Sequence, residues 1–519
     1  MIKPNSKPSL STGPSYAVIT DPLIGTATAR IEAALVAKSS NAMVMRETRL
    51  PAVTYFPLAD VSAELIPVPD FQTFCPFKGT ARYFDVVVNG ERYERGAWHY
   101  PKALPEARSV EGHVAFGVPV TVETDGSSSP AADRPLSGPL VEWMLRAAHF
   151  QSDAASLTAS FGEALNAHGV AVSRISIMIG LLDPLVIGRN FVWSRDKGVE
   201  TFSPSYDIQT DPAFVNSPLR LVSEGLGGVR QRLTEEEAEF CFPIMDELKR
   251  SGATDYVAMP LIFSDGEINV LTLTCDHPDG FTTANLGLVF ELSGALARYF
   301  EVFTQRDNVR SILQTYVGPR TAERVLKGDI RRGDGEEMEA AIILCDLRNS
   351  TRLESELGRD AYLELLNRFF EACAEPIQKQ GGEVLKFIGD AVLAVFSSNG
   401  DKELACANAA NAARDILAAV DLCCDEFDDS EVNCAIGAAY GSVHYGNVGS
   451  LDRLDFTVTG EAANIAARLS DYGKTCGHRI IATGDIASTF SGALGLGIVD
   501  LKNVGEPVAA FALDKTEKD

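Results

Sequence analysis

The stretches AAIILCDLRNST (residues 340–351) and EVLKFIGDAVLAVF (residues 383–396) decide the fold of the last third of this chain. The first opens on a continuous apolar run, which predicts a strand buried on both faces, and the run ends on Asp346. The second predicts two strands around a tight Ile-Gly-Asp turn that contains Asp390. We therefore expect one carboxylate at the end of the buried strand and another at the tip of the hairpin.

The residues between these stretches predict helices. Thr351 and Glu354 have the spacing of a capping box, so a helix is expected to begin there. Apolar residues then recur every three or four positions over residues 360–380, which predicts a helix with one buried face. Gly381 and Gly382 end it. The order strand, helix, hairpin favours a split βαβ sheet in which the first strand lies beside the hairpin.

In such a sheet Asp346 and Asp390 meet at one edge. Two carboxylates brought together repel each other unless a cation lies between them. Hard oxygen ligands suit magnesium or manganese. A single Asp after a strand is more often an N-cap or turn residue, but the pair in this frame favours a metal site.

Composition limits the partners and the compartment. The 519 residues suggest about three domains at roughly 150 residues each. The net charge of -25 repels phosphate backbones, so nucleic acid is not an expected partner. No apolar run approaches the ~18 residues of an integral membrane segment. The ten cysteines show no zinc spacing, and we interpret them as reduced thiols of a cytoplasmic protein.

The chain divides by composition. A polar stretch, ETDGSSSPAADRPLSGP, indicates a linker between two domains, and short β-branched and aromatic runs after it predict strands. The expected segments are a flexible tail (1–20), a mostly-β domain (21–120), a linker (121–138), a second domain (139–305), a helical linker (306–339) and a third domain (340–515).

Three blocks of the third domain resemble the class III nucleotide cyclases: DLRNST, GGEVLKFIGDAVLAVF and DFTVTGEAANIAARL. The resemblance covers about residues 310–515. Asn349 and Ser350 stand where the family often has Gly-Phe, a change that spares the carboxylate. The resemblance implies a ferredoxin-like (βαββαβ) core within an α+β multidomain chain. It also implies a head-to-tail homodimer with two active sites at its interface.

The family resemblance also implies an activity, the conversion of ATP to 3′,5′-cyclic AMP and pyrophosphate with two Mg²⁺ or Mn²⁺ ions per active site. The metal residues come from one subunit, and the base, ribose and transition-state residues come from the other. By resemblance, Asp346 and Asp390 hold the metals together with the carbonyl of Leu347. The resemblance also implies that Asn464 orients the ribose and that Arg468 stabilises charge on the α-phosphate. Lys502 is implied to bind the triphosphate.

Two further positions bear on the choice of purine. Adenine N1 is a hydrogen-bond acceptor and pairs with a donor such as Lys386, whereas the family's guanylate cyclases have an acidic residue at this position. Thr457 stands where many adenylate cyclases carry Asp, and its hydroxyl can accept a bond from the adenine amino group. This resembles the Thr/Ser subgroup, whose members often respond to bicarbonate. The alternative for Lys386 is a solvated strand lysine.

The second domain resembles a GAF-like sensor, an α/β domain found before many bacterial cyclases. The resemblance lies in its strand and helix order and in ATDYVAMPLIFSDG (residues 253–266). Phe191, Trp193 and Tyr256 could line a cavity for an unknown small-molecule ligand. Plain core packing is the favoured interpretation for each of them taken singly.

The first domain resembles domain of unknown function 427, a small mostly-β family. The residues that carry the resemblance are TYFPLADV, CPFKGTARYF, GAWHYP and GHVAF. Cys75, Lys78, Trp98, Tyr100 and His113 are candidates for a pocket, in which a Cys beside a His would suggest a nucleophile.

Three other functions compete with an adenylate cyclase. One is a degenerate cyclase domain that only binds nucleotide or a partner, and another is a cyclase that uses GTP. A third is a cyclic dinucleotide synthase with a related palm-like fold. The presence of Asp346, Asp390, Asn464 and Arg468 together favours an active nucleotide cyclase.

Overall fold

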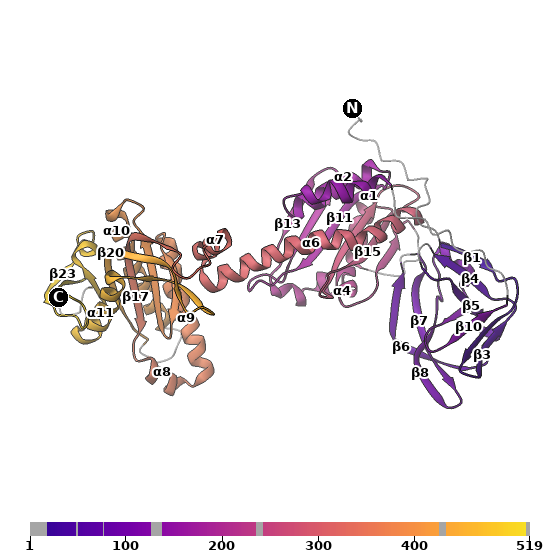
Figure 1. Ribbon diagram of the computed structural model, residues 1–519, viewed down its shortest axis with the longest axis horizontal. Coiled ribbons are helices and arrows are strands. Elements are labelled where there is room, and N and C mark those ends of the chain that lie inside the picture. Colours follow the sequence, from indigo (N-terminus) through magenta and orange to yellow (C-terminus); the bar gives the residue numbers. More distant parts are fainter. Residues whose placement is uncertain are drawn as a thin grey trace. The chain divides into compact units, whose positions relative to one another are not determined.

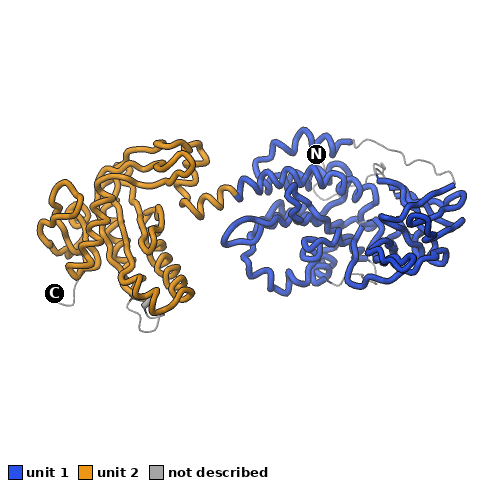
Figure 2. Tube along the Cα trace, turned by 60° about the horizontal axis from the view of Figure 1, so that its bottom comes forward, with its two compact units in different colours: residues 1–308 blue, residues 309–519 orange. Residues whose placement is uncertain are grey.

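A computed structural model describes residues 18–47, 50–75, 77–125, 138–234, 242–424 and 432–514. The chain forms two compact units, with the boundary between Asn308 and Val309 (Figure 2). Most of the predicted tail and residues 126–137 of the predicted linker lie outside the described residues. Across the described ranges, no helix is both long enough and apolar enough to cross a membrane.

The first unit begins with a β-rich part made of two antiparallel sheets (Figure 1). The larger sheet has the order β1-β4-β5-β9-β8-β7-β6, and the smaller has the order β10-β2-β3. The strands are β1 (Val18–Pro22), β2 (Ala27–Ile31), β3 (Ala34–Ser39), β4 (Met43–Glu47), β5 (Val53–Pro57), β6 (Glu64–Cys75), β7 (Gly79–Val88), β8 (Glu91–His99), β9 (His113–Phe116) and β10 (Thr121–Thr124), with 3-10 turns η1 (Leu58–Asp60) and η2 (Pro105–Val110).

The second part of this unit is a six-stranded sheet with the order β13-β12-β11-β16-β15-β14. Helices α2 and α6 pack their apolar residues on one face, and α4 and α5 pack on the other. Its elements are α1 (Pro139–Arg146), η3 (Ala148–Phe150), α2 (Ala154–Ala167), β11 (Val172–Gly180), β12 (Gly188–Ser194), β13 (Gly198–Phe202), η4 (Tyr206–Thr210), α3 (Pro212–Val215), α4 (Pro218–Ser223), β14 (Val229–Arg232), α5 (Pro243–Arg250), β15 (Asp255–Ile262), β16 (Ile268–Cys275) and α6 (Thr283–Val317).

Phe77 joins the two parts of the first unit. Its side chain is 1% exposed and belongs to the core of the second part, although its neighbours in sequence belong to the first. Its ring lies edge-on to Phe290 of α6, with the ring centroids 6.3 Å apart. Close by, the Thr283 hydroxyl donates a 2.8 Å hydrogen bond to Glu106, whose carboxylate also lies 3.7 Å from Arg230.

Phe77→Ala is expected to destabilise the first unit by about 3–5 kcal/mol, because it empties a fully buried aromatic site. The three tryptophans (Trp98, Trp143 and Trp193) all lie in this unit, so their fluorescence during urea unfolding measures its stability. Phe150→Ala is the matched control, since Phe150 is 78% exposed. An equal unfolding midpoint for the two variants would show that Phe77 does not stabilise the contact between the two parts of the first unit.

The second unit is built on one mixed sheet of eight strands with the order β18-β19-β17-β20-β22-β24-β23, and β21 pairs with β20. Its elements are α7 (Pro319–Lys327), β17 (Gly335–Leu347), α8 (Ser350–Leu357), α9 (Arg359–Lys379), β18 (Glu383–Ile388), β19 (Ala391–Ser397), α10 (Lys402–Cys424), β20 (Cys434–Gly449), β21 (Leu454–Thr459), α11 (Glu461–Cys476), β22 (Ile480–Thr483), α12 (Gly484–Ala487), β23 (Leu494–Val499) and β24 (Val508–Ala512).

The core of this sheet has the predicted ferredoxin-like arrangement. Strands β20, β17, β19 and β18 lie side by side in that order, with α9 between β17 and β18 and α10 between β19 and β20 in sequence. Ile343 of β17 packs toward α9 and α10, whereas Ile342 packs toward α11. Because helices cover both faces, the strand is apolar at every position from Ala340 to Cys345, as its sequence indicated. The predicted α+β fold class is confirmed.

The structure differs from the sequence predictions at several boundaries. Helix α8 begins at Ser350 after Asn349, whose φ of 57° is left-handed, and no side chain caps this helix, so the predicted capping box is wrong. Helix α6 continues to Val317, inside the expected helical linker (306–339), whereas β17 begins five residues before 340. Strand β10 occupies residues that we assigned to the linker, because they pair with β2.

Candidate active site

Asp346 and Asp390 meet at one edge of the sheet, as predicted. Asp346 stands next to last in β17, opposite Ala391, the first residue of β19. Asp390 occupies the two-residue turn before β19 together with Gly389, whose φ of 63° is favoured in glycine. The Leu347 amide donates a 3.2 Å hydrogen bond to the carbonyl of Asp390, which ties the strand end to the turn.

The backbone after Asp346 is also anchored to α11. The Arg348 amide donates a 2.7 Å hydrogen bond to the carbonyl of Asn433, and its guanidinium donates a 2.7 Å bond to the carbonyl of Gly473 near the end of α11. The edge that carries the two carboxylates is therefore held by the hairpin turn on one side and by α11 on the other.

Helix α11 lies unusually close to β20. A Cβ on Gly437 would stand 1.8 Å from the carbonyl oxygen of Ala466, so only glycine allows this approach. One turn later, the Ser470 hydroxyl donates a 2.9 Å hydrogen bond to the carbonyl of Ala435. Ala435 is the β20 residue paired with Asp346, and this contact sets the last turns of α11 above the carboxylate edge.

Lys474 contacts this edge and was missed by the sequence analysis. Its ammonium donates to the Asp346 carboxylate, and it also lies 3.5 Å from Asp471. Arg468 lies 3.2 Å from the other oxygen of Asp471. The signal in the sequence was the helical spacing of Arg468, Asp471 and Lys474, which places them on neighbouring turns of α11.

Burial and charge oppose each other at this edge. The side chain of Asp346 is 17% exposed, and burial raises the pKa of its carboxyl group above the usual value, although the Lys474 ammonium acts against this rise. The charge of Asp390 adds to the rise in that pKa. Burial lowers the pKa of Lys474, but its bonds to Asp346 and Asp471 outweigh burial and raise it overall. The edge is therefore a place where a cation is favoured.

These groups fit the divalent cations that the sequence predicts. Asp346 and Asp390 offer carboxylate oxygens and Leu347 offers a carbonyl oxygen, the ligands that Mg²⁺ and Mn²⁺ prefer. Within the described ranges no three His, Cys, Asp or Glu side chains gather in a geometry that could enclose a metal. A set of two carboxylates leaves coordination positions for water and for phosphate oxygens, as is usual for Mg²⁺.

Lys386 lies on β18 and its ammonium contacts the carboxylate of Asp455 on β21. Asp455 and Thr457 are two residues apart on that strand and so share one face, whereas Phe456 and Val458 are buried on the other. The ammonium is therefore held on the face that carries Thr457. Lys386 also lines a cavity of about 750 Å³ that extends to the ends of α6 and α9.

The other predicted residues lie on α11 and in the segment before β24. Asn464 is exposed in the second turn of α11, and Arg468 is half-buried one turn later. Lys502 is exposed in the segment between β23 and β24. Their assignments to ribose, α-phosphate and triphosphate remain predictions.

The three aromatic residues considered for a ligand cavity in the second domain pack in cores, the favoured interpretation for each. Phe191 and Trp193 join the cluster formed with α2 and α6, and Tyr256 joins the cluster on the opposite face. Each is at most 6% exposed. A Cβ on Gly162 of α2 would lie 2.5 Å from the Trp193 ring, so the indole fills the helix–sheet contact. The GAF-like assignment remains a prediction.

Part of the predicted pocket in the first domain does come together. Lys78 forms a 2.7 Å ion pair with Glu47, and both side chains are largely buried. Burial raises the pKa of the Cys75 thiol even though the Lys78 charge lowers it, so the thiol stays protonated. His113 instead lies 3.0 Å from the carbonyl of Glu111. The structure thus pairs Cys75 with Lys78 and gives no support to a Cys–His nucleophile.

Comparison with known families agrees with two of the three resemblances. Residues 24–126 match the family described as a domain of unknown function (DUF427). Residues 335–490 match the family described as the adenylate and guanylate cyclase catalytic domain.

Relatives and solved structures each match about a third of this chain. An uncharacterized protein of Mycobacterium tuberculosis, Rv1320c, is 34% identical over 196 residues, which are 37% of this chain and 33% of that protein. A second from that organism, Rv1319c, is 33% identical over 199 residues, 37% of this chain and 36% of its own. This chain thus matches about a third of the length of each.

Among solved structures, a bacterial light-regulated adenylyl cyclase is 26% identical, with 34% of this chain and 91% of that chain covered and a TM-score of 0.30. The guanylyl cyclase Cya2 is 24% identical, with 34% and 93% covered and a TM-score of 0.29. From the family matches we conclude that residues 335–490 are a catalytic domain of the adenylate and guanylate cyclase family and that residues 24–126 are a domain of the DUF427 family.

Proposed function

We propose that this chain is a homodimeric adenylate cyclase that converts ATP to 3′,5′-cyclic AMP and pyrophosphate. The observation that carries the choice of ATP is the Lys386 ammonium, which Asp455 holds on the same strand face as Thr457. A fixed donor beside a hydroxyl acceptor complements adenine N1 and the adenine amino group. Guanine N1–H would meet the ammonium as donor against donor.

The residues divide the reaction between them. The ribose 3′-hydroxyl attacks the α-phosphorus and pyrophosphate leaves, so no covalent enzyme intermediate is required. Asn464 orients the ribose, and Arg468 places a fixed positive charge where negative charge gathers on the α-phosphate. Asp346 and Asp390 would hold divalent cations, whose charge would lower the pKa of the hydroxyl and neutralise the leaving oxygens.

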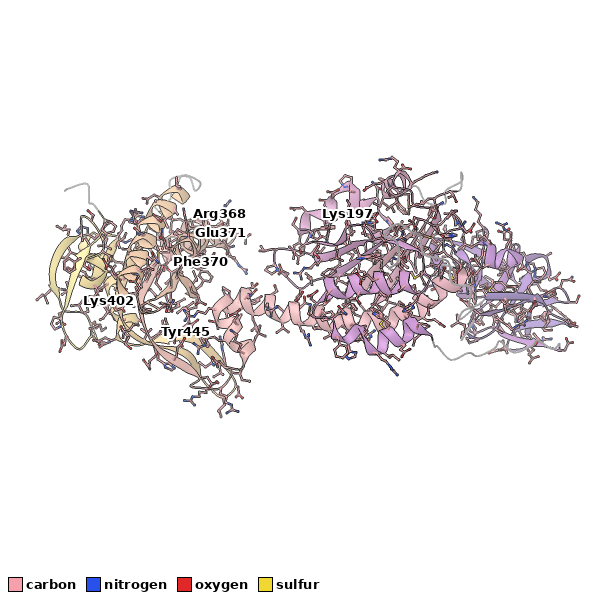
Figure 3. The ribbon with its side chains drawn as sticks, turned by 90° about the horizontal axis from the view of Figure 1, so that it is seen from above. Lys197, Arg368, Phe370, Glu371, Lys402 and Tyr445 are labelled. Atoms are coloured by element: carbon pink, nitrogen blue, oxygen red, sulfur yellow. The ribbon has the colours of Figure 1, made fainter. Side chains whose placement is uncertain are left out.

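Exposed apolar side chains support a dimer. Phe387 and Ile388 are about half exposed beside the hairpin turn, and Phe387 stacks on Phe370 of α9 with ring centroids 4.2 Å apart. Figure 3 labels Phe370 in this unit. Leu451, between β20 and β21, is 90% exposed. Apolar surface of this kind next to a site is typical of a protein interface.

Regulation by the upstream domains is supported by how α7 packs. The Thr321 and Tyr445 hydroxyls lie 3.2 Å apart, and the Tyr445 hydroxyl donates a 3.2 Å hydrogen bond to Glu383 (Figure 3 labels Tyr445). Glu383 is the first residue of β18, the strand that carries Lys386. Since α7 follows α6 directly, a movement of α6 would reach the strand that reads the base.

The direct test is to incubate the purified chain with ATP or GTP and Mn²⁺ and to identify the products by mass spectrometry. We expect cyclic AMP and pyrophosphate from ATP, and little product from GTP. Cyclic GMP as the main product would identify a guanylate cyclase. Nucleotide binding without any product would identify a degenerate module, and a cyclic dinucleotide would overturn the cyclase assignment.

Lys386→Glu is expected to lower kcat/KM for ATP by about ten- to a hundredfold, because a carboxylate faces adenine N1, acceptor against acceptor. It need not gain full GTP activity, since Thr457 does not complement the guanine edge. Lys379→Glu, at an exposed position of α9, makes the same charge change away from the site. Equal ATP kinetics in the two variants would show that Lys386 is only a solvated strand lysine.

A further inference from the structure

The negative net charge of this chain repels any nucleoside triphosphate. The net charge is -25, so a binding site for ATP must provide its own positive charge. Of the cations assigned by resemblance, Arg468 and Lys386 belong to the half of the site that serves the partner's metals. At the edge that carries Asp346 and Asp390, the Lys474 ammonium contacts the Asp346 carboxylate.

Several contacts place Lys474 there. Gly437 lets α11 approach β20, and Ser470 bonds to the residue paired with Asp346, so Lys474 follows one turn later above the carboxylate. Its side chain is only 36% exposed, and its ammonium contacts both Asp346 and Asp471.

We propose that Lys474 is a substrate-binding residue that alternates between two partners. It neutralises Asp346 while no metal is bound and turns to the triphosphate oxygens of ATP once a divalent cation takes the same carboxylate. This proposal deepens the proposed function and rests on it.

The alternation follows from the chemistry of the oxygen atoms. A divalent cation and an ammonium group compete for the same Asp346 carboxylate oxygen, and the cation carries the larger charge. Asp471 keeps the displaced ammonium at the edge, 3.5 Å away in this structure. The α-, β- and γ-phosphates that the metals bind lie at the same edge, and a lysine ammonium is a common point-charge partner for phosphate.

The test uses Lys474→Met, which removes the charge and keeps most of the side-chain volume. The nucleotide-free protein should bind Mn²⁺ about three- to tenfold more tightly, because the competing cation is gone. The KM for ATP should rise by about tenfold, because a charged phosphate contact is lost. Mn²⁺ affinity is measured by electron paramagnetic resonance, and affinity for a non-cyclising ATP analogue by calorimetry.

Lys474→Arg keeps the charge and should restore both values to within about threefold of wild type. Lys327→Met, at an exposed position of α7, is the matched control and should change neither. Unchanged Mn²⁺ affinity in Lys474→Met would overturn the competition for Asp346, and unchanged analogue affinity would overturn the triphosphate contact. Neither binding measurement needs turnover. A wild-type chain that makes no cyclic nucleotide would contradict the proposed function, whereas the two binding results test this inference independently.

Discussion

Asp346→Ala and Asp390→Ala are each expected to lower kcat/KM for ATP by at least about a thousandfold. Each change removes a carboxylate that would bind a metal ion, and the charge of that ion stabilises the transition state by several kcal/mol. Both residues lie at the rim of the sheet and outside its apolar cores, so the fold should survive the change. Initial rates of cyclic AMP formation at saturating Mn²⁺ measure the effect.

The control for these variants is Asp360→Ala, which removes an exposed carboxylate from the first turn of α9. It should keep close to full activity. Circular dichroism and light scattering establish that all three variants remain folded and of the same mass as the wild type. Substantial cyclase activity in either Asp346→Ala or Asp390→Ala would contradict the metal assignment.

Mixing two inactive chains is expected to restore activity. Asp390→Ala damages the metal half of a site and Arg468→Ala damages the transition-state half. If each site combines the two halves across a head-to-tail interface, a heterodimer of these chains has one intact site and one doubly damaged site. Random exchange should then recover about a quarter of wild-type activity, because half of the dimers are heterodimers with one of two sites working.

The matched control mixes Asp390→Ala with Asp346→Ala. Both changes damage the same half, so every site in that mixture lacks a metal ligand and no activity should return. Native mass spectrometry of tagged chains verifies that heterodimers form in both mixtures. Proven heterodimers of Asp390→Ala and Arg468→Ala without recovered activity would mean that the two halves of a site come from one chain.

The edge that carries Asp346 and Asp390 could be predicted from sequence, because each element that forms it follows from a local pattern. A continuous apolar run identifies β17 as a strand buried on both faces, and the Gly389–Asp390 turn identifies the hairpin. Once the strand lies beside the hairpin, Asp346 and Asp390 must lie at the same edge of the sheet. Each step depends on hydrophobic periodicity and turn conformation, which neighbouring residues largely determine.

Local patterns failed where a competing contact decided the outcome. Thr351 and Glu354 have capping-box spacing, yet α8 begins at Ser350 because Asn349 adopts a left-handed conformation just before it. Phe191 and Trp193 were compatible with a ligand cavity or, as we favoured, with core packing, and α2 and α6 cover them. For these aromatic residues the type alone allowed two outcomes, and tertiary packing selected one.

The sequence by itself determined the order of the elements, the cyclase family of the third domain and the position of its two carboxylates. Only the tertiary structure decided that Lys474 meets Asp346 and that Asp455 holds Lys386. These contacts join residues 128 and 69 positions apart, and they depend on how closely α11 approaches β20 and on the pairing of β21 with β20. Such distances between distant segments follow from packing that no local periodicity encodes.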